Sequence, residues 1–120
     1  MSVQGSLDQF MLDRGHEHER RVEDSFKESV DVPNWFHSIR KSTIDEDHRG
    51  IDFIVETKDL GPIFLQIKSS KTGAKNFIKK YGARAKTIAL VVIRDADNNF
   101  FIRTKIFSAI EKLRKQFRPY

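Results

Sequence analysis

Three polar side chains interrupt the most strand-like part of the sequence, GIDFIVETKDLGPIFLQIKSS, which spans Gly50 to Ser70. Asp52 lies in the first of its two apolar segments, whereas Gln66 and Lys68 lie in the second. Because side chains alternate across a strand, a hairpin whose turn centres near residue 59 or 60 brings Asp52 opposite Gln66 or Lys68. Either register places the three side chains on one face of the sheet, so we expect them to form a polar cluster.

A cluster of this composition suits a divalent metal ion beside a phosphate. The Asp52 carboxylate, the Gln66 amide oxygen and the Ile67 backbone carbonyl are oxygen ligands of the kind that Mg²⁺ or Mn²⁺ binds. Lys68 should not bind the metal, but its ammonium group can orient or help to deprotonate an attacking water and offset the charge of a phosphorane-like transition state. The competing interpretation is a hairpin whose Gln and Lys are solvated and whose Asp only completes a turn.

A second carboxylate comes from the first predicted helix, which Ser6 or Asp13 caps and which ends near Val30. At about 100° per residue, Phe26 and Val30 point to within about 20° of the direction of Glu19. Glu19 therefore lies on the apolar face of this helix, where a carboxylate needs a partner. We expect it to reach the polar cluster as a catalytic acid and metal ligand, since two carboxylates match one divalent charge.

The first half of the chain contains three predicted strands, at residues 35–40, 51–56 and 63–69. Between the first two of these, KSTIDEDHRG is expected to be a polar loop. The strands at 51–56 and 63–69 flank the turn signal TKDLGP and are expected to form the hairpin.

The second half begins with KTGAKNFIKKYGARAK, which predicts a short basic helix with Gly82 at its C-terminal cap. TIALVVI, at residues 87–93, predicts a central strand covered on both faces, and FFIRT, at residues 100–104, is expected to be its hairpin partner. A terminal helix then buries the apolar stripe Ile106, Phe107, Ile110, Leu113 and Phe117. The order α, β, β, β, α, β, β, α predicts one α/β domain over residues 1–120, with helices flanking a mixed central sheet.

Composition excludes several classes of function. The 120 residues contain no Cys, which rules out a disulfide framework, a thiolate zinc site and a cysteine nucleophile. The sequence lacks a P-loop, a dinucleotide fingerprint, a G-x-S-x-G elbow and HExxH spacing. No apolar run approaches the roughly 20 residues that span a bilayer, and the N-terminal residues lack a signal-peptide pattern, so we expect a soluble cytoplasmic protein without a membrane partner. Two interpretations are open for Asp45, Glu46 and Asp47, which either bind a second ion or form a solvated loop.

Positive charge is concentrated in the second half of the chain. Residues 1–60 carry eight Lys/Arg and fourteen Asp/Glu, whereas residues 61–120 carry fourteen Lys/Arg and three Asp/Glu. Clustered cations replace counterions on phosphates, so this asymmetry is typical of a protein with a polyanion partner, although solvated faces of a basic protein would show it as well. The expected contacts to the nucleic acid backbone follow Lys68 into a helix N-terminus and comprise Ser69, Ser70, Lys71, Lys75, Lys79 and Lys80.

These residues resemble the signature of the PD-(D/E)XK nuclease superfamily, an acid at the start of one strand and then an acid, any residue and Lys on the next. Here the pattern is Asp52, a hairpin and Gln66-Ile67-Lys68. Glu19 in GHEHE is similar to the first-helix glutamate of archaeal Holliday-junction resolvases, and LQIKSS resembles the Gln-containing variant of Mrr-type restriction nucleases. The resemblance covers residues 15–93 and implies a restriction-endonuclease-like αβββαβ core. The departure is Gln66, a neutral ligand where the superfamily more commonly has Glu or Asp.

The resemblance implies a metal-dependent endonuclease that hydrolyses DNA phosphodiester bonds. Glu19, Asp52, Gln66 and the Ile67 carbonyl would hold Mg²⁺ or Mn²⁺, and Lys68 would assist the water. Such an enzyme could select branched DNA or act in restriction or mobile elements, and it is compatible with a homodimer and with a larger recombination or restriction complex. Two alternatives keep the nuclease fold without independent catalysis: a nucleic-acid-binding module and a subunit that is active only with a partner.

Overall fold

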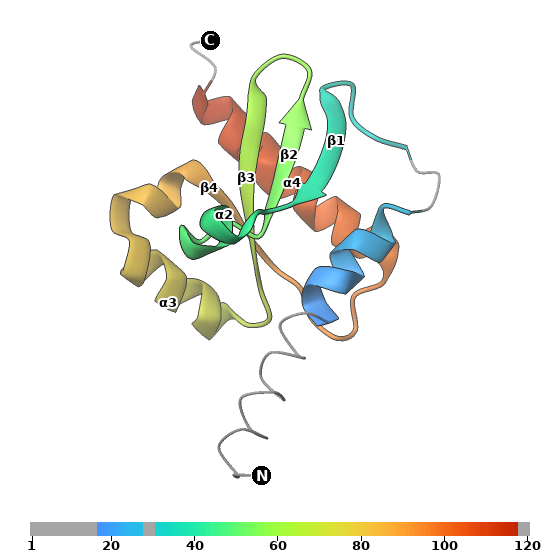
Figure 1. The fold of residues 1–120 in the computed structure, drawn as a ribbon. Helices are drawn as coiled ribbons and strands as arrows, with labels where there is room; N and C mark the ends of the chain where they lie inside the picture. The colour runs from blue at the N-terminus through green and yellow to red at the C-terminus, as the bar shows by residue number, and fades with distance from the viewer. Residues whose placement is uncertain (1–16, 28–30, 118–120) are drawn as a thin grey trace.

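The computed structural model describes residues 17–27 and 31–117 as helices packed around one sheet (Figure 1). Residues 17–25 are helical and residues 26 and 27 form a turn, while the predicted cap at Ser6 or Asp13 and the predicted end near Val30 lie outside the described residues. The elements that follow are β1 (Phe36–Lys41), α2 (Ile44–His48), β2 (Phe53–Thr57), β3 (Gly61–Lys68), α3 (Lys71–Tyr81), η1 (Gly82–Thr87), β4 (Ile88–Val92) and α4 (Asn99–Phe117).

The sheet is mixed, with four strands in the order β1-β2-β3-β4. β2 pairs antiparallel with both β1 and β3, whereas β3 and β4 run parallel. A parallel pair needs a crossover connection, and here α3 and η1 provide it. The prediction of an α/β chain with a mixed sheet flanked by helices is confirmed.

The prediction that TIALVVI forms a central strand is wrong. Within the part of the chain that the structure describes, β4 pairs only with β3 and is an edge strand. Its apolar run has another cause, because side chains of the strand are buried against helices on both faces of the sheet. Ala89 and Val91 pack with α4, and Ile88 packs with Phe77 of α3. Burial on two faces therefore does not require a strand on each side.

FFIRT was expected to be a strand, but it forms the beginning of α4. Asn98 ends the preceding loop, and its Oδ1 accepts a hydrogen bond from the backbone N–H of Phe101 at 2.8 Å, as an N-cap residue does. Phe100 and Phe101 are 68% and 49% exposed, so this pair is not part of a buried strand. Ile102 is instead the first member of the buried stripe that continues through Ile106 and Ile110.

The expected loop KSTIDEDHRG contains the short helix α2. Thr43 and Glu46 form a capping box, in which the Glu46 N–H donates to Thr43 Oγ1 at 3.3 Å and the Thr43 N–H donates to Glu46 Oε1 at 2.8 Å. Arg40 of β1 also pairs with the Glu46 carboxylate, and this hydrogen bond lowers the pKa of Glu46 to about 2. These contacts fasten α2 to the end of β1.

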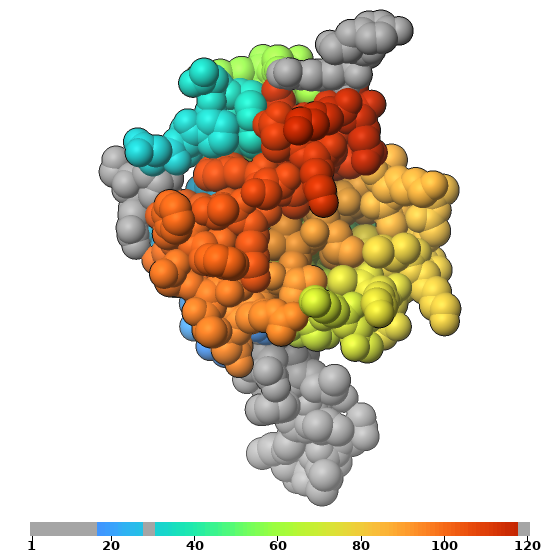
Figure 2. All heavy atoms as spheres, turned by 180° about the vertical axis from the view of Figure 1, so that it is seen from behind, coloured from blue at the N-terminus to red at the C-terminus, as the bar shows by residue number. Residues whose placement is uncertain are grey.

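Two apolar layers cover the sheet. One face packs on α4 and on the helix at residues 17–25, and α4 lies across the back of the molecule in Figure 2. The other face packs on α3 through a smaller cluster that includes Phe77. Ile51, which was predicted to be part of the strand at residues 51–56, belongs to this smaller cluster, because β2 begins only at Phe53 and the alternation of its side chains does not extend back to residue 51. The larger layer includes Val22, Phe53, Val55, Leu65, Val91, Ile102, Ile106 and Ile110.

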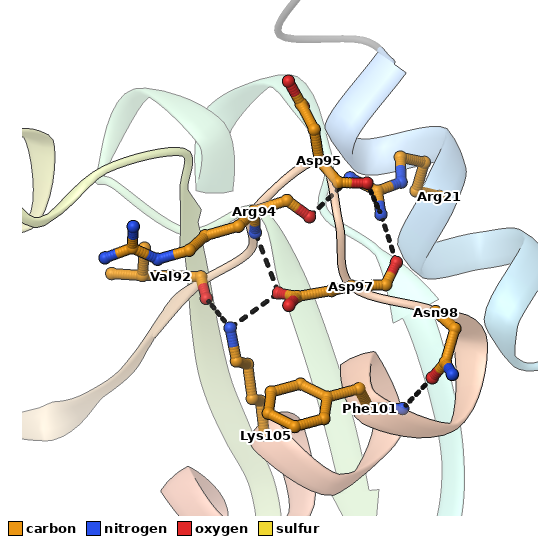
Figure 3. Close-up of polar contacts among 8 residues, drawn as sticks. All are labelled: Arg21, Val92, Arg94, Asp95, Asp97, Asn98, Phe101 and Lys105. Carbon is orange, nitrogen blue, oxygen red and sulfur yellow. Dashed lines mark hydrogen bonds and ion pairs between the residues drawn. The ribbon is translucent and has the colours of Figure 1, made fainter.

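The helix at residues 17–25 is also held by polar contacts to the second half of the chain (Figure 3). Arg21 donates to the backbone carbonyls of Arg94 and Asp97, and Arg103 of α4 donates to the carbonyl of Ser25 at 2.6 Å. Lys105 of α4 holds the loop between β4 and α4 by donating hydrogen bonds to the carbonyl of Val92 and to the Asp97 carboxylate. These contacts hold the first helix beside the sheet, which matters because this helix carries Glu19.

In the described part of the chain, no helix has both the length and the apolar composition needed to cross a membrane.

The turn into β2 generates a prediction about Gly50. This residue has φ +83°, and a Cβ there would lie 2.9 Å from Tyr81 Cζ and 3.0 Å from Phe77 Cε2, whereas a Cβ at Gly61, with φ +74°, would meet no atom within 4 Å. We expect Gly61→Ala to lower the free energy of unfolding by about 1 kcal/mol through backbone strain alone. Gly50→Ala adds overpacking and should cost about 3 kcal/mol or more. Urea denaturation of both variants measures the difference, and equal losses would contradict the close packing of α3 on this turn.

Candidate functional site

The candidate site begins at the open end of the β2–β3 hairpin. Phe53 pairs with Leu65, the register that sets Asp52 beside Gln66, although Asp52 itself precedes β2 and its N–H donates to the Leu65 carbonyl at 2.8 Å. This is one of the two predicted registers. Asp52, Gln66 and Lys68 line one cavity of about 390 Å³, so the prediction that they share a face is confirmed.

Asp52 is the most buried carboxylate of the site, at 8% exposure. Its Oδ2 accepts a hydrogen bond from the Ile67 N–H at 2.8 Å. Burial raises the pKa of Asp52 to about 7, with contributions from the nearby charges of Glu19 and Asp47, although the Ile67 hydrogen bond and Lys68 act in the opposite direction. A cation in the cavity would favour the ionised form, so the carboxyl group is suited to exchange a proton for a metal ion.

Three carboxylates from separate parts of the chain meet at this point. One oxygen each of Glu19, Asp47 and Asp52 lies within 4.8 Å of the others. The prediction that Glu19 reaches Asp52 from the first helix is therefore confirmed. Glu19 is also paired with Lys41 of β1, whose Nζ lies 3.2 Å from Glu19 Oε2.

The three acids of α2 have different roles in the structure, and the sequence alone does not show which acid has which role. Asp47 joins the carboxylate cluster, Glu46 binds Arg40 and caps the helix, and Asp45 is exposed outside the cluster. The T-x-x-E capping box at residues 43–46 was the sequence signal for this helix. Recognising it would have placed three consecutive acids on different sides of a helix instead of in one loop.

Gln66 contributes to the site a side-chain amide oxygen that accepts no hydrogen bond from the described residues. The residue is 7% exposed, and its Oε1 forms no hydrogen bond with any of the described residues. An unsatisfied buried acceptor costs about 1 to 3 kcal/mol, so native proteins rarely keep one without a reason. Ile67 contacts the cluster through its N–H, and the expected role of its carbonyl as a ligand stays a prediction.

Helix α3 forms the basic wall of the cavity. Asn76 and Lys80 line it together with Gly73, and their spacing of three to four residues marks one face of the helix. Of the six residues predicted to contact a nucleic acid backbone, Lys80 alone lines the cavity. Asn76 was missed, although its helical spacing from Lys80 was visible in the sequence.

The other predicted backbone contacts surround the start of α3. Ser70 is the N-cap residue, and its Oγ accepts a hydrogen bond from the Gly73 N–H at 3.0 Å. The exposed residues Ser69, Lys71, Lys75 and Lys79 lie outside the cavity, on the loop before α3 and on the helix itself. The three lysines among them add exposed positive charge to the helix that contributes Lys80 to the cavity.

No family model matches the chain, and comparison with curated proteins and with solved structures finds no match either. Function therefore has to be inferred from the geometry of the site. Three carboxylates lie together, and two of them, Asp47 and Asp52, share a single cavity with the buried Gln66 amide and with Lys68.

The raised pKa of Asp52 predicts a specific dependence of stability on pH. Below about pH 4 the carboxyl is protonated in both the folded and the unfolded chain, whereas between about pH 4 and 7 it ionises more readily in the unfolded chain. The stabilising contribution of neutral Asp52 is therefore lost as the pH rises through about 7. Asp52→Asn keeps an acceptor for the Ile67 N–H and removes the charge, so it should be more stable than the wild type at about pH 8 and not at about pH 4.

Urea denaturation in EDTA at the two pH values measures this effect. Asp45→Asn is the matched control, because it removes an exposed acid of α2 that lies outside the cluster. A stability difference between wild type and Asp52→Asn that is the same at both pH values would contradict the raised pKa.

Proposed function

We propose that the protein is a metal-dependent nuclease that hydrolyses phosphodiester bonds of DNA. The observation that carries the proposal is a cavity lined by Asp52, Lys68 and Gln66, whose side-chain oxygen has no partner among the described residues, with the Glu19 carboxylate close to that of Asp52. Hard divalent cations bind carboxylate and amide oxygens, and Mg²⁺ commonly shares phosphate oxygens of the substrate. Mg²⁺ or Mn²⁺ fits this donor set.

The order of the elements supports membership of the PD-(D/E)XK nuclease superfamily. The helix at residues 17–25, the strands β1, β2 and β3, helix α3 and strand β4 follow the αβββαβ order of its restriction-endonuclease-like core. In this proposal α2 is an insertion between the first two strands, and α4 is an addition after the core. The acid and the lysine of the superfamily signature occupy positions 52 and 68, with Gln66 in place of the second acid.

The chemistry proposed for the site is attack by water on phosphorus. A bound divalent ion supplies a Lewis acid that lowers the pKa of water and offsets phosphate charge. Glu19 and Asp52 hold the ion, while Lys68 orients the water and stabilises negative charge on the phosphate oxygens. The water oxygen forms a bond to phosphorus, the bond to one sugar oxygen breaks, one water proton is released and the leaving oxygen takes up a proton.

The charge distribution supports a nucleic acid as the substrate. Asp47 of α2 and Asp52, just before β2, line the acidic side of the cavity, whereas the wall formed by α3 presents Lys80 and Asn76 to it. Lys71, Lys75 and Lys79 extend the positive surface beyond it. A phosphate in the cavity would lie between Lys80 and the carboxylates of Asp47 and Asp52.

The proposal predicts metal-dependent cleavage that needs Asp52 and Lys68. Purified protein should cut supercoiled plasmid or a four-way DNA junction with Mg²⁺ or Mn²⁺ and not with EDTA. Asp52→Ala and Lys68→Ala should each lower the rate by about 100-fold or more, because one removes a metal ligand and the other an assisting group. Lys58→Ala, in the turn at the far end of the hairpin, is the control and should cut like the wild type.

The ratio of junction to plasmid cleavage would begin to define the substrate. Cleavage that neither substitution affects would refute this site. If the folded wild type binds DNA and does not cut it, the nucleic-acid-binding module that keeps the nuclease fold becomes the better proposal. A specific observation favours that alternative, since Gln66 is neutral where the superfamily more commonly has an acid.

The basic surface predicts how DNA affinity depends on salt. Replacing Lys71, Lys75, Lys79 or Lys80 singly by Ala should weaken binding to unrelated DNA sequences by similar factors, because interactions with the phosphate backbone carry no sequence information. Each substitution that removes one lysine–phosphate interaction should lower the slope of log affinity against log salt by about 0.9. Fluorescence anisotropy over a salt series measures both quantities, with Lys58→Ala as the control. Unchanged slopes in all four variants would place the DNA elsewhere.

A further inference from the structure

Helix α2 is held in place by contacts that aim one of its acids at the site. Its capping box fixes the start of the helix, and Arg40 binds Glu46 through both carboxylate oxygens at 3.2 and 3.3 Å. The end of the helix is tied to the turn before β2, because the Gly50 N–H donates to the Asp47 carbonyl at 3.0 Å. Asp47 therefore approaches Asp52 from a restrained backbone.

Gln66 provides a second and independent sign of a bound cation. Its side chain is more than nine-tenths buried, lines the same cavity as Asp47 and Asp52, and has an Oε1 without a hydrogen-bond partner among the described residues. A cation between these groups would give this oxygen a partner. An amide is a neutral ligand, however, so it cannot offset the charge of the ion.

The charge that the ion needs has to come from the carboxylates. Glu19 is partly neutralised, because Lys41 Nζ lies 3.2 Å from its Oε2. Asp52 alone would leave one positive charge of a divalent ion without a counterpart. Asp47 is the one remaining acid of the cluster in the described part of the chain, with a carboxylate oxygen within 4.8 Å of those of Glu19 and Asp52.

We propose that Asp47 is a direct ligand of the divalent ion and supplies, from α2, the carboxylate that β3 lacks at Gln66. This inference rests on the metal site of the proposed function and adds a ligand to it. The site then contains two acids that are free of Lys41, one acid shared with Lys41, and one neutral oxygen. A chain with Gln at position 66 thereby keeps enough negative charge to hold the ion.

Binding of Mn²⁺ to the full chain without DNA tests the proposal, by isothermal titration calorimetry or by loss of the free-ion signal in electron paramagnetic resonance. Asp47→Asn should weaken Mn²⁺ affinity by about tenfold or more, as expected for a direct carboxylate ligand. Asp45→Asn is the matched control, because it removes the same charge from the same helix outside the cluster, and it should change affinity by less than about twofold. Circular dichroism checks that both variants are folded.

A rescue experiment separates ligation from a general effect of charge. Gln66→Glu in the Asp47→Asn background returns a carboxylate to the cavity and should recover most of the lost affinity. The proposal is overturned if Asp47→Asn binds Mn²⁺ like the wild type, if Asp45→Asn weakens binding equally, or if the wild type binds no Mn²⁺. If Mn²⁺ binding depends on Asp47 but the protein cuts no DNA, the proposed nuclease activity is refuted. The proposal that Asp47 is a metal ligand then still holds.

Discussion

The register of the β2–β3 hairpin is the constraint on which the candidate site depends. Phe53 opposite Leu65 directs both side chains into the core beneath α4, so Gln66, the next residue of β3, lies on the face covered by α3, where Asp52 lines the same cavity. A slip of one residue would exchange the two faces and bury polar groups beneath α4. The hydrogen bond from the Ile67 N–H to Asp52 Oδ2 holds the acid across the two strands in this register.

The other two carboxylates reach Asp52 on elements that polar contacts help to hold in place. The helix that carries Glu19 is tied to the loop before α4 through Arg21 and to α4 itself through Arg103. α2, which carries Asp47, is tied to β1 through the pair of Arg40 and Glu46. The carboxylate cluster exists only when all these elements are assembled, because like charges at this separation repel one another. Folding therefore brings together three carboxyl groups whose ionised forms a cation would stabilise.

The cavity joins two surfaces of opposite charge. Its acidic side comes from the first half of the chain, and its basic side comes from Lys68 and from Lys80 on α3. The crossover between the parallel strands β3 and β4 has to pass over one face of the sheet, and this places the basic helix directly beside the hairpin that carries Asp52. Because of this topology, acids from the first half of the sequence and lysines from the second half lie on opposite sides of one cavity.

The sequence alone determined those features that depend on local periodicity. The alternation in the hairpin predicted that Asp52, Gln66 and Lys68 share a face, and the helical spacing of Glu19 and Phe26 predicted an inward carboxylate, because side-chain direction follows from backbone period. Only the tertiary structure decided that β4 is an edge strand and that FFIRT begins α4, because apolar residues mark burial without saying which surface covers them. It also decided which of the acids of α2 joins the cluster, since that choice depends on how α2 is fastened between β1 and β2 by contacts beyond the helix itself.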